Sequence, residues 1–494
     1  MFPGLKKIKI YAVKAGRIPG IYETWDDANE QIKGFAGAIH KSFTNRKDAE
    51  AYMEENDSTS VAESDESIPV HIPDSLSMLN TEQRKAFDAV VGGKSVFITG
   101  PGGTGKSFLL QNLYAHYKGY TGKKIAITAL TGCAAILIGS FAKTLHSWAG
   151  IGLGRGEVDV LAAEIAKDKR KGPRWRKTDC LVIDEVSMMT PTLLELLDAV
   201  AKAARKSTKP FGGMQIVLVG DFYQLPPVSS RNFAFESPLW TFEAIELTEI
   251  IRQKDPAFQE ILNQARVGEL TDASLEILES RKTEEWKRQE IKPTLLFTRN
   301  TDVNAINDNK LKKLEGEEKV FEAKTSSKPG MRADIVQMLV EKLDRDAPYE
   351  VHLRLKVGAQ VMLLKQMYED NCPIHGLVNG SRGIVLDFAA DGNPIVKFLS
   401  GRTITVRPAT WELEEVEREQ IPLRVAYAVT IHKAQGASLD SALVDVGTNT
   451  FEYGQAYVAL SRARSLDALF IYEVSKSAFR AHPAVKAFYA GIKN

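Results

Sequence analysis

The alternation of apolar and polar residues changes character several times along the chain. Residues 8–13, IKIYAV, alternate with the period of two that a half-buried strand shows, and after the turn AGRIPG a helix begins with Thr24 as its cap. From residue 78 onward, helical patterns alternate with short β-branched runs: SVFITG, KKIAITAL, CLVIDE and MQIVLVGD. Strands that alternate with helices predict parallel sheets with helices on both faces.

The pattern after residue 295 predicts a second α/β domain with an insertion. TLLFTRN resumes the strand–helix alternation, whereas residues 350–408 read as closely spaced strands with glycine turns, which is typical of a small β-barrel. RVAYAVTIHKAQG and ALFIYEV then return to the α/β pattern. The predicted domain ranges are 1–53 for a small α+β module, 54–77 for a linker, 78–248 for the first α/β domain, 249–349 and 421–494 for the second, and 350–420 for the inserted barrel.

Charge is distributed unevenly among these ranges. The whole chain has a formal net charge of +1, but residues 54–77 carry seven acidic groups and no Lys or Arg. Residues 1–53 carry +3, which leaves +5 for residue 78 onward. The acidic, serine-rich stretch has too few large apolar residues to offset its ordering entropy, so we expect a flexible linker there.

Composition places the protein inside a cell. The three cysteines, Cys133, Cys180 and Cys372, show neither a disulfide framework nor metal-ligand spacing, which fits a reducing compartment. No apolar run reaches the length of a membrane span, and residues 1–13 lack the apolar core of a secretory signal. We expect an intracellular protein without a membrane partner.

The stretch GPGGTGKS has the pattern of a phosphate-binding loop. Its glycines let successive backbone N–H groups point into one concavity, Lys106 reaches the β- and γ-phosphates, and Ser107 supplies a hydroxyl for Mg²⁺. The alternative is a chance glycine-rich turn, which the position between a strand and a helix disfavours. The predicted nucleotide-binding residues in this loop are Gly100, Gly102, Gly103, Thr104, Gly105, Lys106 and Ser107.

CLVIDE supplies the second half of such a site, because it is an apolar strand that ends in two acids. Asp184 is predicted to hold Mg²⁺, and Glu185 to orient and deprotonate the attacking water. Phosphoryl transfer also needs cations at the developing charge, and Arg252 and Arg462 are candidates from distant segments. Taken alone, each arginine would more often be a surface or salt-bridge residue.

A series of ordered motifs gives these residues a common context: LNTEQ, GPGGTGKS, TALTGCAA, TLHSWAGIGLG, IDEVSM, PFGGMQIVLVGDFYQLPPV, LTEIIRQKD, LVNGSRGIV, AYAVTIHKAQGASLD and YVALSRAR. In this order they resemble superfamily-one DNA helicases of the petite-integration-frequency (Pif) type, relatives of the bacterial RecD helicases. The resemblance covers about residues 76–475. It implies two RecA-like P-loop NTPase domains, an inserted SH3-like β-barrel, and ATP in the cleft between the domains.

The resemblance also implies roles for individual residues. Gln83 would read the adenine edge, Gln224 would sense the γ-phosphate and the attacking water, and Arg252 and Arg462 would approach from the second domain. The residues that match the family's strand-contacting motifs are Thr131, Thr144, His146, Trp148, Thr430, His432, Lys433, Gln435 and Gly436. His146 and Trp148 could equally serve as core residues.

The basic run KDKRKGPRWRK, residues 167–177, contains Trp175 and just precedes IDEVSM. By the resemblance it lies near the wedge that splits the duplex, so strand contact is one interpretation. A solvated loop and a nuclear-import signal are the alternatives.

The N-terminal module resembles the hybrid-binding, viroplasmin-like domain of eukaryotic ribonuclease H over residues 8–53. YAV, GRIPGIY, TW and KSF are in register, although Ala36 stands where a proline is usual. Trp25, Lys41 and Ser42 match the positions that contact an RNA–DNA hybrid across its minor groove, and Phe43 is more often a core residue. The match ends before any nuclease carboxylates, which disfavours a fused nuclease.

Together these observations predict an ATP- and Mg²⁺-dependent DNA helicase, moving 5′ to 3′ by family, that binds single-stranded and duplex DNA. An RNA–DNA hybrid is a further expected partner, and we expect a monomer in the nucleus, with the mitochondrion as the alternative. Roles in repair, recombination, replication or telomere maintenance fit this class. A translocase that does not separate strands and a hybrid-binding protein with an inactive motor remain alternatives, although none of the motor residues is missing.

Overall fold

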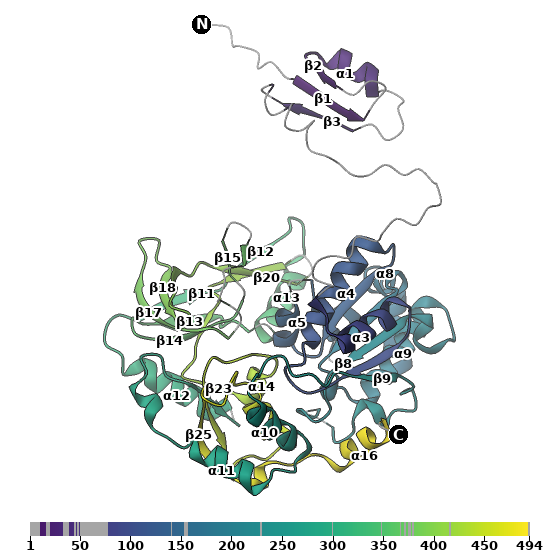
Figure 1. Ribbon diagram of the computed structural model, residues 1–494. Helices are drawn as coiled ribbons and strands as arrows, with labels where there is room; N and C mark the ends of the chain where they lie inside the picture. Colours follow the sequence, from purple (N-terminus) through teal and green to yellow (C-terminus); the bar gives the residue numbers. More distant parts are fainter. Residues whose placement is uncertain are drawn as a thin grey trace. The chain divides into compact units, whose positions relative to one another are not determined.

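The structure is a computed structural model (Figure 1), and it divides into two compact units, Met1–His71 and Ile72–Asn494. It describes residues 10–15, 20–32, 39–43, 46, 49, 78–139, 141–152, 157–227, 230–298, 300–346, 348–365, 367–369, 372–373, 377, 380–413 and 416–492. The predicted linker, residues 54–77, lies outside the described residues.

The described residues of the first unit include an antiparallel sheet and the helix α1. Its elements are β1 (Ile10–Ala15), β2 (Gly20–Tyr22), α1 (Trp25–Ile32) and β3 (Ile39–Phe43), with the strand order β2-β1-β3. Helix α1 begins as predicted, because the Thr24 hydroxyl accepts a hydrogen bond from the Asp27 N–H at 3.2 Å. Trp25 is 43% exposed, and its ring lies beside those of Tyr11 and His40. Trp25 is therefore a surface residue rather than core.

The second unit begins with a six-stranded parallel sheet, which we call domain 1. The strands, in the order β6-β5-β7-β8-β4-β9, are β4 (Val96–Thr99), β5 (Ile125–Ala129), β6 (Lys143–Thr144), β7 (Cys180–Asp184), β8 (Gln215–Val219) and β9 (Glu243–Glu246). Alternate residues of one strand enter different cores: Cys180 and Val182 join one apolar cluster, and Leu181 and Ile183 join another. Both faces of the sheet are therefore covered, as predicted.

Helices surround this sheet. They are α3 (Thr81–Val91), α4 (Lys106–Tyr120), α5 (Gly132–Ile138), α6 (Leu145–Ala149), α7 (Val158–Lys167), α8 (Lys171–Lys177) and α9 (Pro191–Arg205). Three-ten turns lie at Val186–Met188, Pro210–Gly213 and Ala234–Glu236. None of the helices in the described part of the chain has the length and hydrophobicity that crossing a bilayer requires.

A four-stranded parallel sheet forms domain 2, in the order β23-β10-β24-β25. Its strands are β10 (Thr294–Phe297), β23 (Ala428–Thr430), β24 (Ala442–Val446) and β25 (Leu469–Val474). Its helices are α10 (Pro256–Val267), α11 (Asp272–Ser280), α12 (Asn300–Lys312), α14 (Ile431–Ala434) and α15 (Gln455–Leu460), with three-ten turns at Glu285–Arg288 and Lys476–Ala478.

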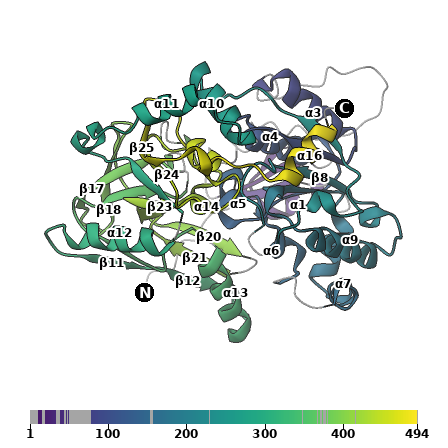
Figure 2. The same cartoon turned by 90° about the horizontal axis from the view of Figure 1, so that it is seen from below.

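The last helix, α16 (Pro483–Ile492), corrects one predicted boundary. Residues 421–494 were assigned to domain 2, but Val485 and Tyr489 are buried in the apolar core of domain 1, with Phe488 packed against it. Figures 1 and 2 show α16 beside the helices of domain 1. The sequence pattern marks the helix as amphipathic but does not identify the domain whose core receives its apolar face.

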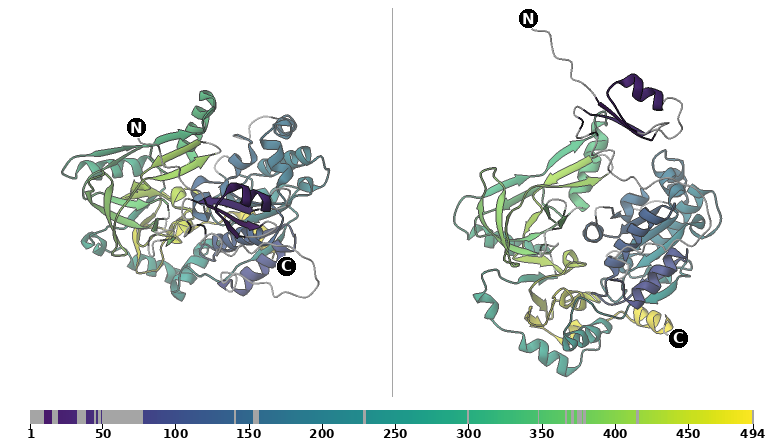
Figure 3. Two further views of the ribbon diagram at one scale, coloured as in Figure 1. Left: turned by 90° about the horizontal axis from the view of Figure 1, so that it is seen from above. Right: turned by 45° about the horizontal axis from the view of Figure 1, so that its top comes forward.

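The inserted region is antiparallel and larger than predicted. Its main sheet, in the order β19-β18-β17-β14-β22, contains β14 (Gln360–Leu363), β17 (Arg382–Phe388), β18 (Pro394–Phe398), β19 (Thr403–Thr405) and β22 (Leu423–Val425). Strand β22 lies beyond the predicted end at residue 420. It belongs to the inserted region because it pairs with β14, which is distant in the sequence. The green strands of this region and the blue domain 1 form opposite sides of the second unit (Figure 3).

Strands before residue 350 also join this region. They pair in two smaller sheets, made of β11 (Lys319–Glu322) with β13 (His352–Leu355), and of β12 (Lys324–Ser327) with β21 (Val416–Gln420) and β20 (Ala409–Leu413). Helix α13 (Ala333–Asp346) connects them, and a short ladder joins β15 (Tyr368–Glu369) to β16 (Cys372–Pro373). The predicted start at residue 350 is therefore too late.

The basic run 167–177 is mainly the helix α8, so the alternative interpretation as a solvated loop is wrong. Trp175 is fully buried, its ring centroid is 4.7 Å from that of Trp148, and its indole N–H donates to the Ala149 carbonyl at 3.0 Å. Arg174 donates to the Ser147 and Trp148 carbonyls. Trp148 and Trp175 are therefore core residues, and they are not available to stack on a base.

Replacing Trp175 should test this assignment. Trp175→Ala is expected to lower the free energy of unfolding by about 3–5 kcal/mol, because it leaves a large buried cavity. Arg176→Ala, a change at an exposed position of the same helix, is the matched control and is expected to stay within about 0.5 kcal/mol. Urea denaturation followed by circular dichroism measures both, and equal losses would contradict the burial of Trp175.

Candidate nucleotide cleft and strand interface

The predicted phosphate-binding loop connects β4 to α4 in a conformation that its glycines permit. Gly100 has φ +142° and Gly103 has φ +98°. A Cβ on Gly100 would lie 2.1 Å from the Leu247 carbonyl oxygen, so a side chain at this position would displace the backbone of the adjacent segment. Gly105 stands at the N-terminus of α4 with φ +80°, and the helix directs its first N–H groups toward the cleft.

One cleft of about 940 Å³ brings together residues from both domains. Its walls contain most of the predicted nucleotide-site residues, namely Gly102, Gly103, Gly105, Lys106, Ser107, Asp184, Glu185, Gln224, Arg252 and Arg462, together with Gly436. Asp184 is the last residue of β7 and Glu185 follows it, and Gln224 closes the turn after β8. The carboxyl ends of parallel strands thus meet the loop at one edge of the sheet.

The charges in this cleft are poorly neutralised by the protein itself. Burial, and then the neighbouring Glu185, raise the pKa of Asp184 to about 7. On the other wall, burial and then Arg462 lower the pKa of Arg252 to about 9. Burial also lowers the pKa of Lys106, against the attraction of nearby carboxylates. A cation beside the two acids and a polyanion between Lys106 and the arginines would relieve both imbalances.

The donor set fits Mg²⁺ bound together with a nucleotide. Ser107 offers a hydroxyl and Asp184 a carboxylate, and no group of three or more His, Cys, Asp or Glu that could hold a metal occurs among the described residues. Mg²⁺ in nucleotide sites commonly takes one or two protein ligands and completes its shell with phosphate oxygens and water. An independent protein cage is therefore not required.

Lys106 is already hydrogen bonded to its own loop. Its ammonium group donates to the Gly100 and Pro101 carbonyls at 2.7 and 2.8 Å. On the opposite wall, the Arg252 guanidinium donates to the Ser461 carbonyl at 3.0 Å. Arg462 is 2% exposed and donates to the Val458 carbonyl. These cations are thus held in place by backbone carbonyls, which are weak partners that a phosphate can replace.

Gln83 contacts the phosphate-binding loop through its side chain. It is fully buried and does not line the cleft. Its backbone and side chain form a capping box with Asn80 at the start of α3, and its amide N–H donates to the Thr104 carbonyl at 3.0 Å. Gln83 therefore supports the phosphate-binding loop in this structure, and its contact with adenine stays a prediction.

A buried polar network between the domains was not found from the sequence. The Arg266 guanidinium of α10 donates two 3.0 Å hydrogen bonds to the Asp221 carboxylate, which follows β8 of domain 1. Tyr457 of α15 lies 3.4 Å from the same carboxylate, and its hydroxyl accepts the Gly102 N–H at 2.7 Å. Domain 2 thus contacts the phosphate-binding loop directly. Asp221 and Tyr457 lie inside the motifs GDFYQ and YVALSRAR, which could have signalled them.

The last helix completes this network. The Tyr489 hydroxyl lies 2.6 Å from the Thr99 hydroxyl and accepts the Phe222 N–H at 3.2 Å. The rings of Tyr223 and Tyr489 stack on each other with centroids 4.7 Å apart, and the Arg266 guanidinium lies beside them, 4.8 Å from the centroid of Tyr223 and 5.3 Å from that of Tyr489. No sequence motif marks Tyr489, because its partners come from segments hundreds of residues away.

The predicted strand-contacting residues gather at the starts of short helices. Thr131, Thr144 and Thr430 are the N-caps of α5, α6 and α14, and each side chain accepts a backbone N–H of its helix. His146 lies on α6, and His432 and Lys433 lie on α14. These caps keep the helix starts in place, while the hydroxyl hydrogens of the threonines stay available for donation to phosphates.

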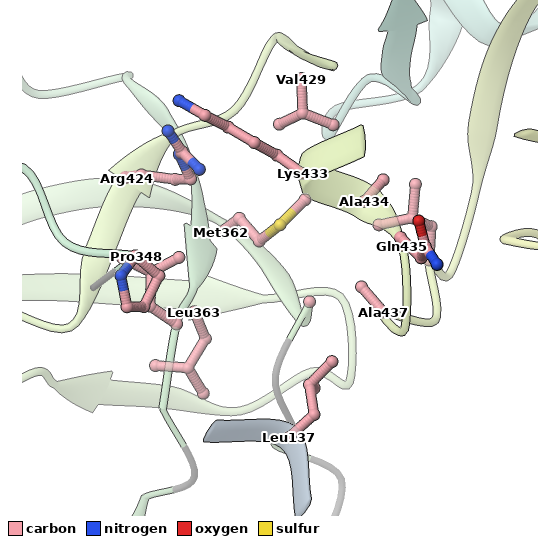
Figure 4. A pocket seen from close by; sticks show the side chains of 13 residues that line it. Leu137, Pro348, Met362, Leu363, Arg424, Val429, Lys433, Ala434, Gln435 and Ala437 are labelled. Atoms are coloured by element: carbon pink, nitrogen blue, oxygen red, sulfur yellow. The ribbon is translucent and has the colours of Figure 1, made fainter. Parts of the chain in front are cut away.

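A second cavity, of about 540 Å³, lies between α14, the inserted sheet and Leu137 of α5. Figure 4 shows Arg424 and Lys433 side by side at one edge and Gln435 at another. Gln435 and Gly436, which were predicted as strand contacts, also lie beside the nucleotide cleft. The Gln435 amide donates to the Glu185 carboxylate at 2.8 Å, and Gly436 lines the nucleotide cleft.

In the first unit, the predicted hybrid-contacting residues share one exposed edge. Lys41 and Ser42 are exposed on β3, which pairs with β1, and Trp25 lies against His40 of the same strand. Phe43 is half-buried, as a core residue at a strand end would be. The three predicted contacts are therefore near one another, and their role in binding stays a prediction.

A phosphate-binding loop, an acidic strand end and two arginines supplied by a second RecA-like domain define a P-loop motor NTPase. Residues 78–285 match the family described as PIF1-like helicase, residues 339–388 match the 2B domain of the DNA helicase Pif1, and residues 9–53 match the ribonuclease H1 N-terminal domain. The chain belongs to the PIF1-like helicase family.

Individual relatives agree with this assignment. The chain is 38% identical over 439 residues to an ATP-dependent DNA helicase PIF1 of Danio rerio, covering 86% of this chain and 66% of that protein. It thus spans just under two thirds of the length of this relative. A Pif1 helicase of Candida albicans is 37% identical with a TM-score of 0.69, covering 84% of this chain and 99% of that one. A Bacteroides Pif1 in complex with ADP-AlF3 and single-stranded DNA is 29% identical with a TM-score of 0.59, covering 84% and 97%.

Breaking the ion pair between the domains should destabilise the protein strongly. Arg266→Met is expected to lower the free energy of unfolding by about 3–5 kcal/mol, because it leaves the Asp221 carboxylate buried without its partner. Arg84→Met breaks an exposed pair with Asp88 that has the same 3.0 Å separation, and it should cost no more than about 1 kcal/mol. Chemical denaturation compares the two variants, and similar losses would show that the buried pair has no special weight.

Proposed function

We propose that this protein is an ATP-dependent DNA helicase that moves on single-stranded DNA and separates duplexes. The observation that carries the proposal is the shared cleft, in which Arg252 and Arg462 face the loop of Lys106 and the acids Asp184 and Glu185. Cations from a second domain make hydrolysis depend on closure of the domains. A binding protein with an inactive motor would have no need to keep this complete set.

We propose a separate task for each residue that lines the cleft. Lys106 and the loop N–H groups would hold the phosphates, and Ser107 and Asp184 would hold Mg²⁺, which neutralises phosphate charge when bound. Glu185 would accept the proton of the attacking water, and Gln224 would orient that water. Arg252 and Arg462 would stabilise the charge that develops on the transferred phosphoryl group.

The track for the strand would cross both domains. Thr131, Thr144 and His146 belong to domain 1, whereas Thr430, His432 and Lys433 belong to domain 2. The Bacteroides relative was solved with single-stranded DNA and a nucleotide analogue together, which supports a strand site that coexists with the nucleotide. We propose the same pairing of sites here, with 5′-to-3′ movement, action as a monomer and work on nuclear DNA, in repair, recombination, replication or telomere maintenance.

The N-terminal unit extends this proposal to RNA–DNA hybrids. Its match to the ribonuclease H1 N-terminal domain and the exposure of Trp25, Lys41 and Ser42 support recognition of a hybrid through its minor groove. A binder tethered to a motor raises the local concentration of the motor near its ligand. We therefore propose that this unit directs the motor to hybrid-containing duplexes.

Strand displacement tests the motor. On duplex DNA with a 5′ tail we expect ATP-dependent displacement, with none on a 3′-tailed duplex. Lys106→Ala should lower hydrolysis by roughly 10²–10³-fold while strand affinity is retained, because the phosphate loop and the strand track are different surfaces. Lys118→Ala, at an exposed position of the same helix α4, is the matched control. Strand-stimulated hydrolysis without displacement would favour a translocase, and hydrolysis that persists in Lys106→Ala would refute the assignment.

Removing residues 1–56 tests the role of the N-terminal unit. Binding and unwinding of RNA–DNA forks should weaken, whereas DNA–DNA forks of the same sequence should be unaffected. Trp25→Ala in the full chain should reproduce most of the loss, because its exposed ring can pack on a sugar face. Unchanged affinity for the RNA–DNA fork in both variants would contradict the proposed targeting.

A further inference from the structure

Gln435 links the predicted strand track to the predicted catalytic carboxylate. It follows α14 in domain 2, yet its side chain crosses to domain 1, where the amide Nε2 donates to Glu185 Oε2 at 2.8 Å. Gln435 is 6% exposed and Glu185 is 9% exposed, so the hydrogen bond is shielded from water. A buried bond between an amide and a carboxylate is stronger than one on the surface.

Glu185 is itself held in an unusual backbone conformation. Its φ and ψ are 58° and 39°, and such left-handed values in a residue other than glycine mark strain that the surroundings must maintain. Gly436, the residue after Gln435, packs closely against Leu137 and Glu185. A Cβ on Gly436 would lie 2.8 Å from Leu137 and 3.8 Å from Glu185 Oε1. The position of the Glu185 carboxylate therefore depends on where residues 434–438 lie.

The same short stretch forms a wall of both cavities. Ala434, Gln435 and Ala437 line the cavity of Figure 4, while Gly436 and Ser438 line the nucleotide cleft. A ligand that reshapes the first cavity must therefore move the groups that contact Glu185. Lys433 and Arg424, at the edge of that cavity, supply positive charge that suits a sugar-phosphate strand.

One atom of Gln435 is left without a partner. Its Oε1 is among the buried side-chain atoms that have no hydrogen bond within the described part of the chain. Buried polar atoms are almost always paired, so an unpaired one calls for an explanation. A second arrangement of this segment, in which Oε1 gains a donor and Nε2 leaves Glu185, would provide it.

We propose that Gln435 is a positioning residue that restrains Glu185 while the strand track is empty. The inference rests on the proposed function. The amide donor occupies one oxygen of the carboxylate and holds it toward residues 434–438, so this oxygen does not accept the proton of the attacking water. A sugar-phosphate strand bound along Lys433 displaces the 434–438 stretch and releases Glu185, and hydrolysis then begins only on an occupied track.

The test compares hydrolysis with and without single-stranded DNA. Gln435→Met keeps the side-chain length and removes the donor. Its strand-free kcat is expected to rise about 10- to 100-fold, because the variant loses one buried hydrogen bond to a charged group. The strand-free KM for ATP should stay unchanged. At saturating oligonucleotide its kcat should match the wild type, so the stimulation ratio collapses. Gln435→Leu, a second variant without the donor, should behave in the same way.

Two controls make the result specific. Gln337→Met removes an exposed amide–carboxylate pair of similar length, 3.0 Å to Glu341, and both rates should remain as in the wild type. Adding Glu185→Gln to Gln435→Met should abolish the raised strand-free rate, because the released base is then missing. Melting temperatures and oligonucleotide affinities of all variants are measured alongside.

The outcomes separate this inference from the proposed function. If the wild-type protein shows no strand-stimulated hydrolysis, the proposed function itself is wrong. A stimulated wild type whose Gln435→Met and Gln435→Leu variants keep or lower the strand-free kcat would overturn the restraint alone. A rise in KM instead of kcat would assign Gln435 to nucleotide binding and would equally overturn it.

Discussion

The ion pair between Asp221 and Arg266 is the contact on which the arrangement of the motor depends. It joins the end of the central strand β8 in domain 1 to the helix α10 of domain 2, and both groups are almost inaccessible to water. The attraction of Asp221 helps to raise the pKa of Arg266 despite burial, so the pair stays charged. A buried pair of this kind adds little net stability over an apolar contact, but it is costly to break and permits few alternative geometries.

The position of Gln224 follows from this contact. The Gln224 N–H donates to the Asp221 carbonyl at 2.9 Å, which closes a tight turn after β8. Gly454 of domain 2 packs against the same turn, since a Cβ there would lie 2.3 Å from the Tyr223 carbonyl oxygen. The residue that faces the nucleotide is thus fixed by both domains at once, and a relative movement of the domains must alter it.

The charges of the cleft explain why the two domains communicate with a ligand between them. Arg252 and Arg462 lie near one another and lose hydration, whereas Lys106 lies near the carboxylates of Asp184 and Glu185. Hydrogen bonds to backbone carbonyls compensate only part of the hydration that these cations lose. The site gains most when a polyanion and a cation fill it together, and that gain is available to drive closure.

Local chemistry in the sequence determined the nucleotide loop, the acidic strand end, the parallel sheets and the helix caps at Thr24, Thr131, Thr144 and Thr430. Each of these depends on residues close together in the chain, and their periodicity and capping preferences act over a few bonds. The family resemblance added Arg252 and Arg462, which no local pattern could have joined.

Tertiary structure alone decided the rest. It placed α16 in the core of domain 1, buried Trp148 and Trp175, turned Gln83 toward Thr104, and set Gln435 on Glu185. The inserted region gained strands on both sides of its predicted range for the same reason. An apolar face or an amide can be satisfied by many partners, and which partner it meets depends on chain segments that come together only when both domains have folded.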